Sequence, residues 1–110
     1  GMPALSAALA KAVKYPKAAS ERGMTGKIYV SFVVDPNGKV TSSKLTKGIS
    51  EDYKPAENPS EEETAKYNAA LEMEQAAINA VNELGLFSPG KKDGKDVSTE
   101  LTIPINFQLQ

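Results

Sequence analysis

The sequence predicts an α+β fold: a three-stranded antiparallel sheet in strand order 2-1-3, with one long helix and one short helix packed on one face. Three patterns lead to this fold class. Hydrophobic and polar residues alternate from Lys27 to Asp35, a long helical pattern follows a capping sequence at Ser60, and a second alternation closes the chain. The 110 residues are enough for one domain and too few for two with separate cores.

Composition narrows the function classes. The chain is 40% hydrophobic and 25% charged, and its formal net charge is −1. This balance gives no reason to expect nucleic acid as a partner. The sequence has no His, Cys or Trp, which excludes Ser-His-Asp and Cys-His catalysis, disulfides and zinc sites built from thiolate or imidazole. Carboxylate acid–base chemistry, a Ser/Lys pair and an oxygen-ligand metal site remain chemically possible, but no motif in the sequence favours one of them. We expect a protein that is not an enzyme, with no catalytic residues, no metal and no cofactor.

Residues 1–13 are expected to precede the domain, which we place at residues 14–110. Gly1 ahead of Met2 is typical of a residue left by tag removal. From Pro3 to Val13, leucines and alanines recur at helical spacing, which fits either a short helix or the ordered end of a linker.

A short helix is predicted from Pro16 to Arg22. The fixed φ of proline suits the first turn of a helix, and Gly23 can adopt the left-handed conformation that ends one.

Two strands joined by a turn come next. The first runs from Lys27 to Asp35, and the segment Asp35–Gly38 has the Pro and Asn-Gly residues of a tight turn. The second strand is predicted from Lys39 to Lys47. Val40 and Leu45 have opposite parity in this strand, so one face holds both only if a β-bulge lies between them.

A long helix follows the polar connection Gly48–Ser60. Ser60 and Glu63 form a capping-box pattern, in which hydroxyl and carboxylate satisfy free amides at a helix start. The helix is predicted from Glu61 to Leu84. Its inward stripe is Ala69, Met73, Ala76, Ala77, Ala80, Val81 and Leu84.

The last strand shows the clearest alternation. Its hydrophobic residues are Val97, Leu101, Ile103, Ile105, Phe107 and Leu109, all of one parity. Its polar residues are Ser98, Glu100, Thr102, Asn106, Gln108 and Gln110, all of the other. This pattern predicts one buried face and one face in contact with water.

Pro104 lies within this strand on the polar parity. Because proline has no amide to donate, strand prolines lie at sheet edges with the missing donor facing outward. The other even-numbered residues then also direct their main chain outward. Such an edge can accept an extended peptide by strand addition, although Pro104 can instead serve only to protect the edge against aggregation.

Several short motifs occur in an order that resembles the TonB C-terminal domain family over residues 14–110. They are Tyr15-Pro16, the Asp35 to Val40 turn, Pro89-Gly90, Gly94-Lys95 and Pro104-Ile105-Asn106-Phe107. The chain departs from the family pattern in two places. Phe87 stands where tryptophan is usual, and the stretch Gly48–Ala70 is longer than usual and carries six acidic residues between 51 and 63.

The resemblance implies a periplasmic domain of a TonB-like energy transducer in a diderm bacterium. In such a protein, a segment upstream of this sequence tethers the domain to the inner membrane and to motor proteins. The domain captures the N-terminal segment of TonB-dependent outer-membrane receptors by strand addition to its last strand, and it transmits force for substrate uptake.

The resemblance and the Pro104 argument point to the same strand. The predicted peptide-binding edge is Ser98, Glu100, Thr102, Pro104, Asn106 and Gln108. The resemblance also implies a secondary contact at Ala12, Val13, Lys14, Tyr15 and Pro16. A second function remains open: an accessory or sensory domain of a larger envelope protein, whose edge forms a homodimer or is covered by its own chain.

Overall fold

The computed structural model describes residues 2–85, 87 and 89–109, with side chains from residue 7 onward. The interpretation of Gly1 as a tag remnant and the placement of Gln110 on the polar face lie outside the described residues. The elements, in chain order, are helices α1 (Met2–Ala12) and α2 (Lys17–Glu21), strands β1 (Gly26–Val34) and β2 (Val40–Lys47), the short 3₁₀ helix η1 (Ser50–Tyr53), helix α3 (Glu61–Asn82), and strands β3 (Gly90–Lys92), β4 (Lys95–Val97) and β5 (Thr99–Phe107).

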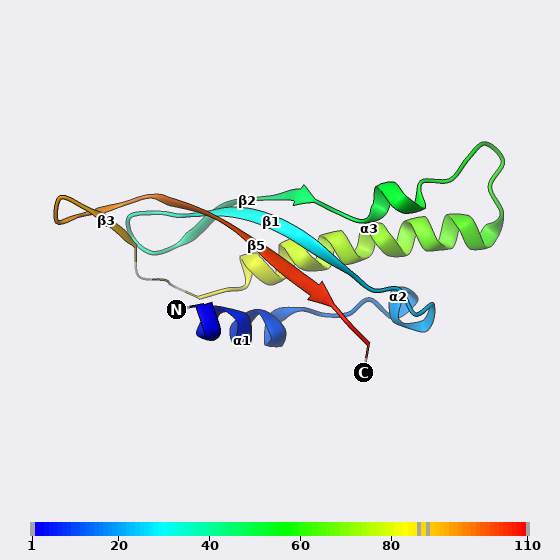
Figure 1. Ribbon diagram of the computed structural model, residues 1–110, viewed down its shortest axis with the longest axis horizontal. Coiled ribbons are helices and arrows are strands. Elements are labelled where there is room, and N and C mark those ends of the chain that lie inside the picture. The colour runs from blue at the N-terminus through cyan, green and yellow to red at the C-terminus, as the bar shows by residue number, and fades with distance from the viewer. Residues whose placement is uncertain (1, 86, 88, 110) are drawn as a thin grey trace.

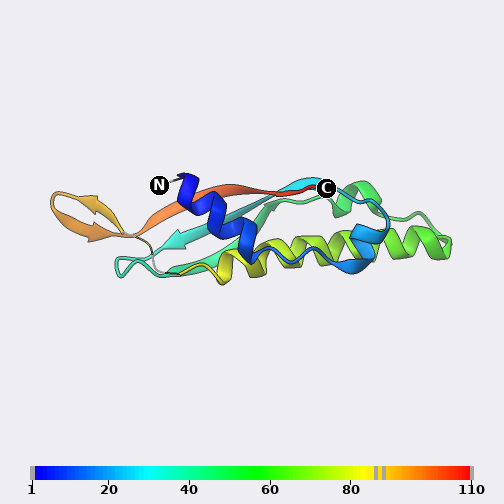
Figure 2. The same ribbon diagram turned by 90° about the horizontal axis from the view of Figure 1, so that it is seen from below.

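The main sheet is three-stranded, with the order β2-β1-β5 and antiparallel pairing throughout. Helix α3 runs along one face of this sheet, and α2 packs against α3 (Figure 1). The predicted fold class and strand order are therefore confirmed. The N-terminal segment takes the helical form, and α1 lies next to β5 with its C-terminal end close to α3 (Figure 2).

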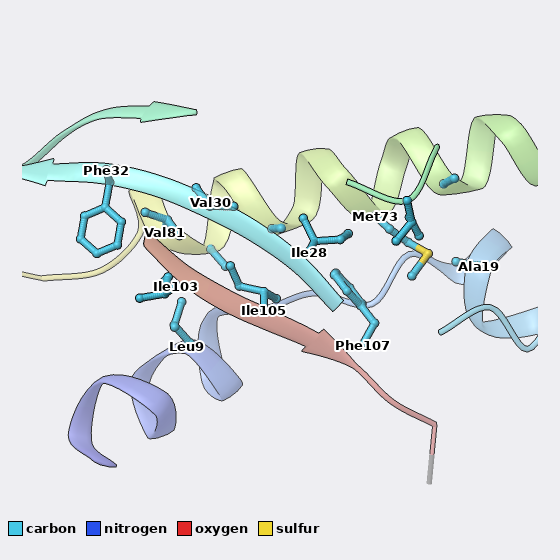
Figure 3. Packing of buried hydrophobic residues seen from close by; sticks show 14 of the residues in the cluster. Leu9, Ala19, Ile28, Val30, Phe32, Met73, Val81, Ile103, Ile105 and Phe107 are labelled. Atoms are coloured by element: carbon cyan, nitrogen blue, oxygen red, sulfur yellow. The ribbon is translucent and has the colours of Figure 1, made fainter. Parts of the chain in front are cut away.

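The core lies between the sheet and α3. Its largest fully buried side chains are Phe32, Phe107, Ile28, Met73, Val30 and Val81. Alternate residues of β1 and β5 point into it, as Figure 3 shows for Ile28, Ile103 and Ile105. The buried face of the last strand ends earlier than predicted, because Leu109 lies beyond β5 and is 45% exposed.

The capping box at the start of α3 is present as predicted. The Ser60 hydroxyl accepts a hydrogen bond from the Glu63 N–H at 3.1 Å, and the Glu63 carboxylate accepts one from the Ser60 N–H at 3.1 Å. Hydrogen bonding of the Glu63 carboxylate to Ser60, to its backbone N–H first and to its side chain second, holds the pKa of Glu63 below its usual value. The helix ends at Asn82, two residues before the predicted Leu84.

Strand β2 contains the predicted bulge. Ser31 pairs with Lys44 and Val33 with Thr41, so β2 has one residue more than β1 in this interval. Ser42 lies in the interval with a positive φ of 53°. The bulge brings Val40 and Leu45 to the same face of the sheet, because they lie opposite Val34 and Val30, although Leu45 at the outer edge remains 36% exposed.

The segment before β5 differs from the prediction. The predicted last strand included Val97, whereas β3 and β4 pair as a separate two-stranded hairpin ahead of β5. Asp93 and Gly94, with φ of 51° and 76°, form the two-residue loop. Two consecutive residues with positive φ match the twist of a hairpin and turn the chain back on itself. The hairpin therefore takes Val97 away from the main sheet.

Phe87 fills a place next to the core despite replacing the usual tryptophan. Its ring lies 6.1 Å from that of Phe32, centroid to centroid. The Phe87 N–H also donates to the Gly38 carbonyl oxygen at 2.7 Å. Gly38 has a φ of +84°, and a Cβ atom there would lie 2.0 Å from the Phe87 oxygen, so only glycine allows this approach.

Candidate functional site

Strand β5 forms one edge of the main sheet, and its main-chain direction follows from its register with β1. Pro104 lies opposite Tyr29, and Glu100 lies opposite Val33. The carbonyl oxygens of Tyr29 and Val33 accept hydrogen bonds from the side-chain hydroxyls of Thr46 and Thr41 of β2, at 3.1 and 3.4 Å respectively. These β1 residues therefore direct their main chain toward β2. Because bonding alternates along an antiparallel ladder, their partners in β5 direct theirs away from β1.

The free edge of β5 consists of the even-numbered residues Glu100, Thr102, Pro104 and Asn106. Thr102 and Asn106 each present an N–H and a carbonyl oxygen, while Pro104 presents a carbonyl oxygen alone. Their side chains are exposed on the sheet face opposite α3. On that face, the Thr102 hydroxyl hydrogen-bonds the Ser31 hydroxyl at 2.7 Å. The edge is thus an open row of donors and acceptors, interrupted at Pro104.

A groove of about 510 Å³ runs along the C-terminal part of this edge. On one side it is lined by six consecutive residues, from Pro104 to Leu109. Successive residues of a strand point to opposite faces of a sheet. A groove on one face of the sheet would contact only the even-numbered or only the odd-numbered residues of β5. Because this groove contacts both, it lies along the free edge of the strand. Its volume lies within the range of about 300–1,000 Å³ that is typical of ligand pockets.

The other side of the groove is formed by α1 and the residues that follow it: Leu9, Ala10, Val13 and Tyr15. Leu9 is 7% exposed and points toward Ile103 of β5 (Figure 3). The Tyr15 ring packs edge-on against Phe107, with ring centroids 5.1 Å apart. Its hydroxyl donates to the Met24 carbonyl oxygen. Burial raises the pKa of Tyr15.

The structure brings together part of each predicted site. Pro104, Asn106 and Gln108 line the groove opposite Val13 and Tyr15. Glu100 and Thr102 lie farther along the same edge, and Ser98 is the single residue between β4 and β5. Gln108 follows β5 directly. Ala12, Lys14 and Pro16 are neighbours of the lining residues in the chain and are not among the lining residues themselves.

Five residues of the groove were not predicted: Leu9, Ala10, Ile105, Phe107 and Leu109. Leu9 belongs to the helical apolar pattern of the N-terminal segment, and this pattern was a signal that the segment packs against the domain. The odd-numbered residues of β5 were assigned to the core, which Ile105 and Phe107 do join. They nevertheless contact the groove because it follows the strand flank.

Among the residues that the structure describes, there is neither a cluster of metal ligands nor a membrane-spanning helix. No group of three or more acidic side chains there is arranged to hold a metal ion. Within the same residues, no helix is both long enough and apolar enough to cross a membrane.

Comparisons with known proteins agree with the fold. The family model described as the Gram-negative bacterial TonB protein C-terminal matches residues 11–68, and the chain belongs to this family. The chain is similar to the NMR solution structure of Helicobacter pylori TonB-CTD residues 179–285, with 27% identity and a TM-score of 0.52 over 94% of this chain and 76% of that one. It is also similar to the solution structure of residues 194–285 of the same domain, with 26% identity and a TM-score of 0.52, over 97% of this chain and 91% of that one. No curated protein matches the chain.

Family membership makes the chain a TonB-type energy-transduction domain. Domains of this family are periplasmic and non-enzymatic, and they act in transport across the envelope of Gram-negative bacteria.

Proposed function

We propose that this domain captures the N-terminal segment of a TonB-dependent outer-membrane receptor as an added strand on β5 and transmits force to it for substrate uptake. The observation that supports this proposal is the groove along the free flank of β5, from Pro104 to Leu109. An extended segment placed along this edge would hydrogen-bond the outward main chain of Thr102 and Asn106 and add a strand to the sheet.

Main-chain pairing suits a mechanical coupling. The part of the edge from Thr102 to Gln108 is about 20 Å long at roughly 3.4 Å per residue, enough for several hydrogen bonds. Force directed along the added strand loads these bonds together. Since the bonds involve main-chain groups, they depend little on the guest sequence, which allows one domain to serve several receptors.

Family membership supports the remaining parts of the proposal. The domain works in the periplasm, tethered to the inner membrane by a segment upstream of this sequence. Motor proteins in that membrane act on the domain through the upstream segment, which completes a path from the motor to the receptor.

Amide NMR tests the proposal with a synthetic peptide that has the sequence of a receptor's periplasmic N-terminus. We expect the largest shifts at Thr102, Asn106 and Gln108. Asn106→Pro removes an outward donor and is expected to weaken peptide binding by about 0.5–1.5 kcal/mol without unfolding the domain. Asn106→Ala is the matched control, because it removes the side chain, keeps the N–H and should bind like the unmodified chain.

Two results would contradict the proposal. One is a set of shifts confined to the connection Gly48–Ser60, which would place the peptide off the free edge of β5. The other is an unchanged affinity in a correctly folded Asn106→Pro variant, which would show that the outward amide at this position takes no part in binding.

The open edge of β5 also supports a second use, a homodimer formed by pairing β5 with β5 of another copy. Sedimentation at increasing concentration tests this alternative. A dimer that dissociates in the Asn106→Pro variant would support it, and a monomer at all concentrations would exclude it.

A further inference from the structure

The α1 side of the groove differs from the edge strand in its chemistry. Its residues Leu9, Ala10 and Val13 are aliphatic, and Tyr15 adds an aromatic ring. The Tyr15 hydroxyl is the polar side-chain group on this side, and it already donates to the Met24 carbonyl oxygen. A polar guest side chain that pointed toward α1 would therefore lose water and find no free side-chain partner there.

The alternation of side chains along a strand decides which residues of an added strand point toward α1. A strand added to β5 keeps the alternation of the sheet, and residues that lie opposite each other share a face. Ile103, Ile105 and Phe107 point to the face covered by α3 and α1, where they share one buried cluster with Leu9. Guest residues opposite them point toward α1. The guest residues between these point to the open face, beside Thr102 and Asn106.

We infer that α1 and the residues after it determine specificity, with Leu9 and Val13 selecting guest segments that carry aliphatic side chains at alternate positions. This inference rests on the proposed function and adds a side-chain requirement to main-chain pairing. Main-chain bonds alone accept almost any sequence, whereas an apolar surface along one flank favours an alternating one. Guest side chains that point to the sheet face opposite α3 need not be apolar, since that face is in contact with water.

The test uses two synthetic peptides of about eight residues, enough to span the groove with a residue to spare at each end. One alternates Thr and Val, and the other contains only Thr. Valine and threonine are both β-branched and nearly equal in shape, so the pair is matched in size and strand propensity. The alternating peptide can always take the register that directs its valines toward α1. Amide NMR titration of the chain gives both dissociation constants.

We expect the unmodified chain to bind the alternating peptide about tenfold more tightly than the all-Thr peptide. Leu9→Ala shortens the apolar side of the groove and should reduce this ratio to about threefold or less. Val13→Thr, which keeps the shape of the side chain and leaves α1 intact, should also reduce it. Leu71→Ala, at a 40% exposed leucine of α3 outside the groove, is the matched control and should leave the ratio unchanged.

The outcomes separate this inference from the proposed function. If both peptides bind equally well and both weaken in the Asn106→Pro variant, strand addition stands and selection by α1 is wrong. Selection by α1 is also wrong if the preference persists in both Leu9→Ala and Val13→Thr. If neither peptide binds the unmodified chain, strand addition to β5 fails, and selection by α1 fails with it.

Discussion

Pro104 sets the character of the free edge of β5 at the level of a single residue. It lies opposite Tyr29 at a position where β5 directs its main chain away from β1, so the missing amide costs no hydrogen bond within the sheet. The same position removes one donor from the row that a guest strand would meet. Pro104 therefore both protects the edge against indiscriminate pairing and leaves Thr102 and Asn106 as the outward donors of β5 on either side of it.

Tyr15 ties the linker after α1 to the sheet through its ring and its hydroxyl. Tyr15→Phe keeps the ring contact with Phe107 and removes the donor to the Met24 carbonyl oxygen. We expect this change to lower the free energy of unfolding by about 1 kcal/mol at neutral pH, as measured by urea denaturation. An equally stable variant would show that the hydroxyl contributes nothing to stability.

The pKa of Tyr15 also predicts a pH dependence. Burial raises it above the ordinary value of 10.0, so folding favours the neutral phenol. This contribution is complete below about pH 10 and is lost as the pH rises through the folded-state pKa. Between about pH 8 and pH 11 the stability difference between the unmodified chain and Tyr15→Phe should therefore narrow. If the stability difference between the two chains stays constant over this pH range, the pKa of Tyr15 is not raised by folding.

Glu74 connects two elements, α3 and η1. Its carboxylate is 7% exposed and accepts hydrogen bonds from the Ile49 N–H at 2.8 Å, the Ser50 N–H at 2.7 Å and the Ser50 hydroxyl at 3.0 Å. Gly48 allows this approach, because a Cβ atom there would lie 2.1 Å from a Glu74 carboxylate oxygen. The Glu74 carboxylate thus fixes the start of the connection between β2 and α3 to α3.

Glu74→Ala should destabilise the domain by about 2–3 kcal/mol, since it leaves two main-chain amides without their acceptor. Glu72→Ala is the matched control. Glu72 is exposed on the same helix, and its loss should change the free energy of unfolding by about 0.5 kcal/mol or less. Hydrogen exchange adds a local measurement, because the amides of Ile49 and Ser50 should lose protection in Glu74→Ala. Equal effects of the two substitutions would disprove this role of Glu74.

The elements that could be predicted from the sequence are those whose pattern is local. The alternation of β1 and β5, the Ser60–Glu63 capping box and the outward direction of Pro104 each depend on residues a few positions apart. Glu74 shows what such patterns miss. A glutamate in a helix normally faces water, and only the approach of Ile49, 25 residues earlier, makes it an internal acceptor.

The candidate site also depends on a contact between distant segments, which local sequence patterns do not predict. The edge strand follows from Pro104 alone, but the groove requires α1 to lie beside β5, and the two are separated by most of the chain. Leu9 is the buried side chain among the described residues of α1. The helical spacing around it indicated a helix without indicating which surface the helix covers.

At the scale of the whole molecule, the domain is long and thin, with extents of 57 × 30 × 15 Å. The three strands of the main sheet run along its length (Figure 1). A guest strand on β5 would lie in the same direction. Pulling on that guest would load the sheet along its strands, the geometry in which hydrogen bonds share the force.

We expect the N-terminal segment to add stability to this molecule without being essential to its fold. We propose that the domain proper begins at Lys14, in accord with the family match that starts at residue 11. Removal of residues 1–13 takes away Leu9, which is 7% exposed, and the half-buried Val13. Burial of one leucine contributes about 1.5–3 kcal/mol, so the shortened chain should lose about 3 kcal/mol. The sheet and α3 keep the rest of the core, and urea unfolding should remain a single cooperative transition. Leu9→Ala in the full chain should reproduce most of the loss. A shortened chain without a cooperative transition would show instead that α1 is an integral part of the folding unit.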